Sequence, residues 1–425
     1  MTTIDKKDSA GKMILLGIQH VFAMFGSTVL VPALTGLNPA VALLCAGVGT
    51  WIFHLVTGRK VPTFLGSSFA FIGVIIAAAE TCSGAAQGTE GYLAGLPYAT
   101  GGIIVAGAVY LLLALVVRLV GVERVRSFFP PIVTGPMIII IGLMLAPTAI
   151  TNILTPIGTN PLWINWVVAI ITLLVIIGVT LFAKGFFKLV PILIGIVVGY
   201  IAAICFGIVD FTPIVEANWI GLPALVLPKF DGRAIALIAP IAIVTFVEHI
   251  GDVAASSAVV GKDFMKDPGL ARTLLGDGLA TMVAGVLGGP ANTTYSENTG
   301  VLAATKNYNP VTLEIAATVA IALAFFGKVG AVLQTLPGPV MGGVSIILFG
   351  MIAAVGLRTL VENQVDFKES RNLLIVSVML VLGLGADKAI VIGNVSISGV
   401  ALAAVLGIVL NKVLPQHIDR AEKGN

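Results

Sequence analysis

The sequence predicts an all-α polytopic membrane protein with fourteen transmembrane segments, arranged as two inverted seven-span repeats. Three observations lead to this fold class. The 425 residues are 57% hydrophobic and only 11% charged, whereas soluble domains carry roughly 25% charged residues. Apolar runs of about 20 residues, the length that crosses a bilayer, recur along the whole chain. The basic residues are concentrated in every second connection between these runs.

The hydrophobic segments follow one another with short connections. Their predicted bounds are 13–32, 38–57, 62–79, 99–120, 129–150, 163–183, 186–209, 233–254, 272–288, 293–305, 310–327, 336–356, 371–387 and 395–414. The third and tenth segments differ from the rest, because each opens on a proline and a polar run before it turns apolar. The tenth is also too short to cross a bilayer as a plain helix.

The distribution of Lys and Arg predicts the orientation. If the N-terminus is cytoplasmic, all but four of the 24 Lys and Arg residues lie in cytoplasmic connections, and the exceptions are Lys229, Arg233, Lys328 and Lys388. An error of one span would invert every later connection and destroy this asymmetry. We therefore expect an even number of spans, with both termini cytoplasmic.

An internal repeat divides the chain into residues 1–209 and 210–425. Late in each half the offset is 208, which pairs Pro131, Gly135 and Gly142 with Pro339, Gly343 and Gly350. Early in each half it is 228, which pairs Pro62 with Pro290, Phe69 with Glu297, and His20 with Glu248. An insertion at about 81–100 reconciles the two offsets. Since seven is odd, the second half is inverted, a pattern typical of secondary transporters with a site between the repeats.

Polar runs open the third and tenth segments, at 66–69 (GSSF) and 292–298 (NTTYSEN). Polar groups at membrane depth are costly unless they line a site. We expect each run to be a short extended strand that leads into a half-helix. Two such strands side by side would satisfy each other's backbone, and the helix N-termini would direct free N–H groups at the site. Phe69 offers a ring for stacking on a planar ligand, with ordinary packing as the alternative.

Four carboxylates are expected within the membrane, where an acid is a functional candidate. Glu248 and Asp252 are four residues apart and share a helix face; Glu297 and Asp277 are the others. A hydrogen-bonded pair or a helix-end position is the alternative, and it is stronger for Asp252 and Asp277. Burial and a neighbouring acid both disfavour a charged carboxylate, so Glu248 and Asp252 are candidates for proton exchange. No Lys or Arg is expected inside a span, which favours a neutral ligand rich in N–H donors over an anion.

The histidines and cysteines complete the candidates. His20 occupies the repeat position of Glu248, so we expect it to supply a supporting hydrogen bond. His54 and His249 are expected to be structural. The three cysteines have no metal-binding spacing, and no nucleophile–base arrangement is evident, so neither a metal, a cofactor nor an enzymatic activity is expected.

Residues 297–306 (ENTGVLAATK) match a signature of the nucleobase–ascorbate transporter family, also called nucleobase:cation symporter-2. The signature reads Gln, Glu or Pro, then Asn-x-Gly-x4-Thr, then Arg, Lys or Gly. The resemblance extends over essentially the whole chain through QHVFAMFGSTVLVP, VPTFLGSSFAF, EHIGD, GDGLAT, NTTYSEN and LPGPVMGGVS. Within the family, Glu at the first signature position is typical of bacterial uracil permeases, whereas xanthine and urate carriers usually have Gln.

The resemblance implies a core domain that slides against a gate domain, within a homodimer. The core would comprise segments 1–4 and 8–11 (about 13–120 and 233–327), and the gate segments 5–7 and 12–14 (about 129–209 and 336–414). Glu248 and Glu297 would bind the base, together with the backbones at Phe69 and Ser296, and Tyr295 would lie beside it. The residues that would couple the proton or support the site are Asp252, His20, Asn298 and Asp277. Other members have a proton-linked His or an Asp at position 252, and uracil carriers often have Gly at position 296.

We therefore expect a proton-coupled uracil importer in a bacterial cytoplasmic membrane, with the proton as coupling ion and no other cofactor. Its partners would be uracil or a related nucleobase, membrane lipid and a second copy of the chain, but no nucleic acid. A xanthine or urate carrier is the first alternative. An anion exchanger or channel of the same architecture is the second.

Overall fold

The computed structural model describes residues 9–89, 91–386, 390–392 and 395–415, so most of both predicted cytoplasmic termini lies outside the described residues. Within them, eight helices are long and apolar enough to cross a membrane. A further pair, Pro310–Ala324 and Gly327–Gln334, meets the same criterion together but is bent by 81°. The chain is thus a multi-pass membrane protein, and the count of fourteen spans stays a prediction.

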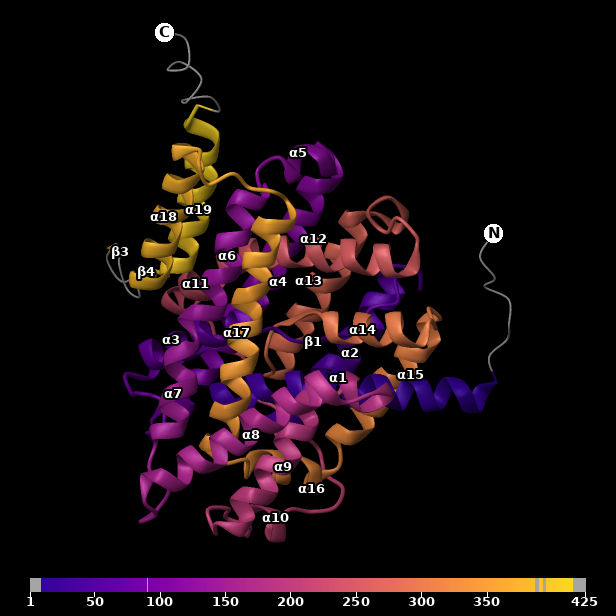
Figure 1. Cartoon of the computed structure of the whole chain (residues 1–425), viewed down its shortest axis with the longest axis vertical. Coiled ribbons are helices and arrows are strands. Elements are labelled where there is room, and N and C mark those ends of the chain that lie inside the picture. Colours follow the sequence, from indigo (N-terminus) through magenta and orange to yellow (C-terminus); the bar gives the residue numbers. More distant parts are fainter. Residues whose placement is uncertain (1–8, 90, 387–389, 393–394, 416–425) are drawn as a thin grey trace.

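Among the described residues up to Glu216, the chain forms ten α-helices and one short strand (Figure 1). They are α1 (Ala10–Thr35), α2 (Pro39–Val56), β1 (Leu65–Ser67), α3 (Ile72–Ser83), α4 (Leu96–Val120), α5 (Val122–Arg126), α6 (Pro131–Met144), α7 (Ala146–Leu154), α8 (Leu162–Phe182), α9 (Pro191–Cys205) and α10 (Thr212–Glu216). Turns of 3₁₀ helix precede α3 at Phe69–Phe71 (η1), α4 at Tyr92–Gly95 (η2) and α9 at Gly185–Leu189 (η3).

The remainder of the described chain also contains a short strand that leads into a helix. Its elements are α11 (Gly232–Ile238), α12 (Ile241–Val260), the π-helical turn η4 (Met265–Gly269), α13 (Leu270–Leu287), β2 (Asn292–Thr294), α14 (Ser296–Thr305), α15 (Pro310–Ala324), α16 (Gly327–Gln334), α17 (Gly338–Glu362), α18 (Ser370–Gly385), β3 (Ile390–Ile392), β4 (Val395–Ile397) and α19 (Gly399–Val413).

Local sequence explains how two of the helices begin. The side chain of Asn38 accepts a hydrogen bond from the N–H of Ala40, and Pro39 is the first residue of α2. The side chain of Asn309 accepts from the N–H of Val311 in the same way, and α15 also begins with a proline. Asn caps the free N–H groups of a first turn, and proline is tolerated there because its missing N–H is not needed.

Each predicted segment contains a helix, but in two segments the helix is divided into two parts. The fifth is divided into α6 and α7, and the eighth into α11 and α12, which meet at Ala239–Pro240. The fourteenth was expected to run from 395 to 414, whereas its helix begins only at Gly399. The residues before it form β4, which pairs antiparallel with β3. This hairpin was not predicted, because its β-branched residues read equally well as part of an apolar span.

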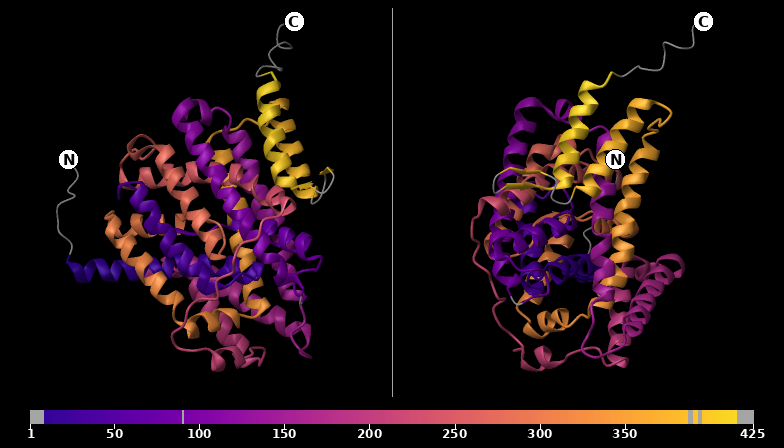
Figure 2. Two further views of the ribbon diagram at one scale, coloured as in Figure 1. Left: turned by 180° about the vertical axis from the view of Figure 1, so that it is seen from behind. Right: turned by 90° about the vertical axis from the view of Figure 1, so that its left-hand side faces the viewer.

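The helices pack in two groups. In one group α13 contacts α4 and α2, while α15 contacts α2 and α1. In the other group α17 contacts α6, α7 and α8, and α18 pairs with α19 at one edge of the molecule (Figure 2). Glycine permits the closest crossings. A Cβ on Gly107 of α4 would lie 2.8 Å from the carbonyl oxygen of Gly278 in α13, and one on Gly356 of α17 would lie 2.6 Å from that of Gly135 in α6.

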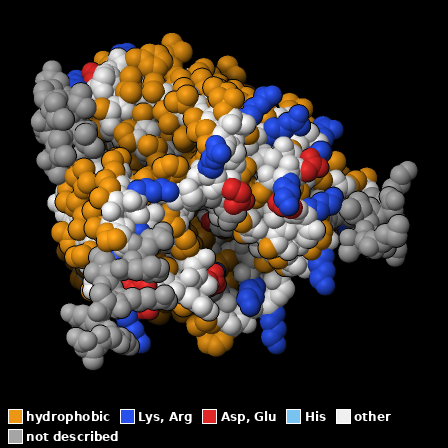
Figure 3. Space-filling view, turned by 90° about the horizontal axis from the view of Figure 1, so that it is seen from above, with side chains coloured by type: hydrophobic (Ala, Val, Ile, Leu, Met, Phe, Trp, Pro, Cys, Tyr) orange, Lys and Arg blue, Asp and Glu red, His pale blue; other side chains and the backbone are white. Residues whose placement is uncertain are grey.

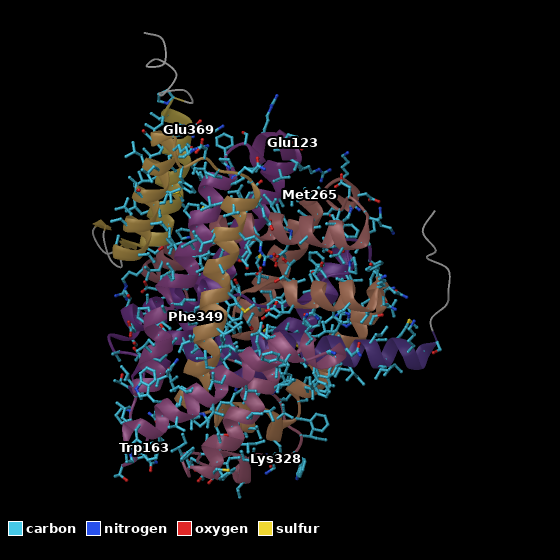
Figure 4. All side chains as sticks on the ribbon, in the orientation of Figure 1. Glu123, Trp163, Met265, Lys328, Phe349 and Glu369 are labelled. Atoms are coloured by element: carbon cyan, nitrogen blue, oxygen red, sulfur yellow. The ribbon has the colours of Figure 1, made fainter. Side chains whose placement is uncertain are left out.

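The two ends of the molecule carry different connections. Glu123, Met265 and Glu369 lie towards one end, and Trp163 and Lys328 towards the other (Figure 4). The connections at the first end are those expected to be cytoplasmic and basic. Lys and Arg side chains are spread over part of this end when it is viewed from above (Figure 3). Three of the connections expected to be cytoplasmic thus lie towards the same end, and the orientation stays a prediction.

Candidate functional site

A two-stranded antiparallel sheet joins the third and tenth predicted segments, each of which has a strand followed by a helix. We call these two segments the broken helices. Its register pairs Leu65 with Thr294, Gly66 with Thr293, and Ser67 with Asn292. The pairing continues beyond the strands, because the N–H of Ser68 donates to the Ala291 carbonyl (2.8 Å) and the N–H of Tyr295 donates to the Phe64 carbonyl (2.9 Å). All residues of both strands are buried. The predicted strands in segments 3 and 10, and their pairing, are confirmed.

Two threonines satisfy the outer edges of this sheet. The hydroxyl of Thr50, on α2, accepts from the N–H of Leu65 (2.9 Å) and lies 3.3 Å from its carbonyl. The hydroxyl of Thr281, on α13, donates to the Asn292 carbonyl (3.1 Å). Unpaired strand edges are prohibitive at membrane depth, so each strand is supported by a helix of its own half. Neither threonine was singled out from the sequence.

Two glycines allow the strands to approach their neighbours. A Cβ on Gly66 would lie 2.4 Å from ring atoms of Tyr295. A Cβ on Gly49 of α2 would lie 2.3 Å from the side-chain nitrogen of Asn292. That nitrogen donates to the carbonyls of Cys45 and Ala280, so Asn292 ties α2 to α13 across the sheet. Any larger residue at either glycine would separate these contacts.

Each strand leads into a helix N-terminus at the predicted place. After β1 the 3₁₀ turn begins at Phe69, and after β2 the helix α14 begins at Ser296. The first N–H groups of a helix have no partner within it and favour electronegative atoms. Ser296 is exposed and Phe69 half-buried, so both positions are open to a small molecule.

Glu297 lies in the first turn of α14 and is half-buried. The hydroxyl of Ser27, on α1, donates to its Oε1 at 2.7 Å. Next to this contact, the hydroxyl of Tyr295 donates to the Ser67 carbonyl (2.9 Å) and lies 3.4 Å from the Thr28 hydroxyl. Two successive residues of α1, Ser27 and Thr28, therefore contact the beginning of α14. The seven-residue spacing of His20 and Ser27 on one helix face could have identified Ser27 from the sequence.

The acids of α12 lie on the other side of this turn, since α12 packs against both α14 and η1. Glu248 and Asp252 are half-buried and one turn apart. The hydroxyl of Thr294, in β2, donates to Asp252 Oδ2 at 2.6 Å. A strand residue of the second broken helix is thus directly bonded to a predicted proton-coupling acid.

Two further residues predicted for the site, Asn298 of α14 and His20 of α1, contact each other. The side-chain nitrogen of Asn298 lies 3.1 Å from His20 Nδ1 and donates to the His20 carbonyl at 3.1 Å. Both residues are fully buried. The expected supporting role of His20 agrees with this contact, although His20 bonds to α14 rather than to an acid of α12.

Asp277 is placed apart from the other candidates. Its Oδ2 lies 2.9 Å from His249 Nδ1, and the second ring nitrogen of His249 lies 2.9 Å from the Thr273 hydroxyl. All three side chains are fully buried between α12 and α13. The pair supports the helix that carries Glu248, which suits the structural role expected of His249.

Phe69 lies at the boundary between the two groups of helices. It packs against an apolar cluster from both groups, which includes Leu30 of α1, Ile72 of α3, and Val344 and Phe349 of α17. Phe349, which marks this cluster, lies between the two ends of the molecule (Figure 4). Phe69 therefore packs against this cluster and is still half-buried, which leaves part of its surface for stacking.

Among the residues that the structure describes, no group of three or more His, Cys, Asp and Glu side chains is placed to hold a metal ion. What the site offers is a pair of opposed helix N-termini, three half-buried carboxyl groups and one ring. This set suits a small, planar molecule that both donates and accepts hydrogen bonds.

Such a site, on two broken helices joined by a strand pair inside a multi-pass membrane protein, defines a membrane transport protein. A family model described as "Permease family", that of the xanthine/uracil permeases, matches residues 11–392. The chain belongs to the nucleobase–ascorbate transporter family, and its relatives are permeases rather than enzymes.

Two relatives are similar over nearly their full length. A probable uracil permease of Haemophilus influenzae is 45% identical over 423 residues, which cover 99% of this chain and 98% of that protein. A uracil permease of Bacillus caldolyticus is 44% identical over 426 residues, with 99% and 96% covered. Among solved structures, the transmembrane domain of the cyanobacterial bicarbonate transporter BicA has a TM-score of 0.65 at 18% identity, with 94% and 98% covered. That likeness shows a shared fold.

Proposed function

We propose that the protein is a proton-coupled uracil importer of a bacterial cytoplasmic membrane. The observation that carries the proposal is the placement of Glu297 in the first turn of α14, next to the strand that pairs with the other broken helix. The names of the relatives, which are uracil permeases, support uracil as the substrate.

The chemistry of the site suits a pyrimidine base. Uracil has two ring N–H donors, two carbonyl acceptors and a flat face. The carboxyl groups of Glu248 and Glu297 would accept from the ring N–H groups, and backbone N–H groups at Phe69 and Ser296 would donate to the carbonyls. The Phe69 ring would stack on the base, and Tyr295 would lie beside it. Because every polar edge of the ligand is then paired, an analogue lacking one group should bind poorly.

Proton coupling is assigned to the acids of α12. Asp252 accepts from Thr294 of β2, so a change in its charge acts directly on the strand that precedes Glu297. Glu248 lies one turn away on the same helix. A proton held by this pair would remove a buried negative charge, which is costly to move through the membrane, and would accompany the base inward.

The movement we propose is that of an elevator. The core domain, formed by the helices around α2, α4, α13 and α15, would carry the base past the gate domain formed around α6, α8 and α17. Fourteen spans in two inverted repeats, cytoplasmic termini, a membrane lipid environment and a homodimer belong to the same proposal. The packing of the helices in two groups supports it.

Equilibrium binding to the purified protein tests the substrate. We expect saturable uracil binding that an excess of xanthine or urate leaves largely unchanged. Stronger binding of xanthine would favour the alternative nucleobase carrier. Bicarbonate or chloride exchange without any uracil binding would contradict the proposal and favour an anion exchanger.

A further inference from the structure

Ser27 makes an unusual contact for a hydroxyl residue within a helix. Several buried Thr side chains in helices of this protein donate to the carbonyl four residues earlier, as Thr50 does to Ala46 and Thr172 does to Val168. The hydroxyl of Ser27 instead donates to Glu297 Oε1, at 2.7 Å and across 270 residues of chain. Ser27 is fully buried, whereas its partner Glu297 is half-buried.

The contact makes the two oxygens of the Glu297 carboxyl inequivalent. Oε1 accepts from Ser27, whereas no side chain of the described residues donates to Oε2, which is the oxygen that we expect to meet a ligand. If Glu297 takes up a proton, a proton on Oε2 leaves the hydrogen bond from Ser27 unchanged, whereas a proton on Oε1 would require the Ser27 hydroxyl to accept instead of donate. One serine thereby favours one acceptor atom and one protonation site of this acid.

We infer that Ser27 is a positioning residue for the substrate, which presents Glu297 Oε2 to a ring N–H of the bound base. This inference rests on the proposed function. The adjacent residue supports it, since Thr28 lies 3.4 Å from the Tyr295 hydroxyl and accepts at its carbonyl from the Ser67 hydroxyl (3.0 Å). Helix α1 is therefore hydrogen-bonded to β1 and to Tyr295, the residue that follows β2, so its backbone is held in place next to Ser27.

Binding measurements with three variants test the role. Ser27→Ala removes the donor, and we expect the Kd for uracil to rise about tenfold, the effect of one hydrogen bond to a charged group. Ser27→Thr keeps a hydroxyl and should remain within about threefold of wild type. Thr180→Val is the control, because Thr180 of α8 donates within its own helix to Ile176, and its loss should not change the Kd.

Infrared difference spectra recorded on adding uracil separate positioning from simple support. A carboxyl band that is absent in Glu297→Gln should shift in Ser27→Ala and return in Ser27→Thr, while the Tm without uracil stays close to that of wild type. An unchanged Kd, or an unchanged band, in Ser27→Ala would overturn the role of Ser27 while uracil binding by wild type stands. Wild-type protein that fails to bind uracil would instead contradict the proposed function, and this role with it.

Discussion

The two broken helices use the same backbone with different side chains. Each has a buried three-residue strand, a threonine on a neighbouring helix that covers the outer edge, and a helix N-terminus directly afterwards. The first begins its helical turn with Phe69, and the second carries Glu297 at the second residue of α14. The shared backbone solves the problem of extended chain at membrane depth. We call the first broken helix, with Phe69, the first arm, and the second, with Glu297, the second arm. The first arm offers an aromatic surface and the second a carboxyl group.

The arms also differ in what holds them. Glu297, Tyr295 and Thr294 of the second arm bond to α1, β1 and α12 respectively. Phe69 of the first arm packs in an apolar cluster shared with helices of the other group. We conclude that polar contacts orient Glu297 in the second arm, whereas packing holds Phe69 in the first. Substitutions in the two arms should therefore fail in different ways.

Glu297→Gln should have the largest effect on binding. It replaces an acceptor with a group that also presents N–H donors, and we expect uracil affinity to fall about 100-fold, at the upper end for a hydrogen bond to a charged group. Isothermal titration with uracil measures the change, with folding checked by Tm. An affinity equal to that of wild type would show that the Glu297 carboxyl does not bind uracil, and would contradict the proposed difference between the two arms.

Gly66→Ala tests the contact between the arms. The added methyl group would meet the Tyr295 ring at 2.4 Å, and overpacking of this kind costs about 1–3 kcal/mol. We expect a lower Tm and weaker uracil binding. Gly178→Ala in α8 is the control, because no neighbouring atom lies within 4 Å of a Cβ there. If both variants behave alike, the arms are not in close contact.

Phe69 variants test whether the first arm stacks or only packs. Phe69→Ala should weaken uracil binding about tenfold, through loss of an aromatic contact and its buried area. Phe69→Tyr keeps the ring and should bind like wild type. Phe69→Leu keeps much of the apolar volume and is the informative variant. Affinity close to that of Phe69→Ala indicates stacking, and affinity close to wild type indicates packing alone.

Tyr295→Phe should have the smallest effect. It removes the hydrogen bond to the Ser67 carbonyl but keeps the ring, at a cost of about 1 kcal/mol in stability. We expect a small decrease in Tm and a change in uracil affinity of at most about threefold. A loss as large as that of Glu297→Gln would show that Tyr295 contacts the base directly.

Much of this architecture was predictable from local patterns. Two polar runs at matching repeat positions predicted β1, β2 and their pairing, and the same repeat placed Phe69 and Glu297 at equivalent positions. The continuous apolar runs located a helix in every predicted segment. These features depend on short stretches of sequence, or on the comparison of two such stretches.

What was missed depends on contacts between residues that are far apart in the sequence. The partners Ser27 and Glu297, or Thr281 and Asn292, are polar residues whose meeting depends on how the helices cross. The breaks at Leu145 and Ala239 and the β3–β4 hairpin were hidden inside apolar runs, because hydropathy does not distinguish a kinked helix from a straight one. For Asp277 the sequence predicted a role in the site, because the residue lies in an apolar segment. In the structure its side chain contacts His249 instead.

Uptake of labelled uracil into proteoliposomes tests the central claim most directly, with a proton gradient or a sodium gradient imposed in turn. We predict that an inward proton gradient drives accumulation above equilibrium, that a proton-conducting ionophore abolishes it, and that a sodium gradient alone does not replace it. Asp252→Asn should bind uracil and exchange it without accumulating it. Accumulation driven by sodium would contradict the coupling, and the absence of any uracil uptake would contradict the account as a whole.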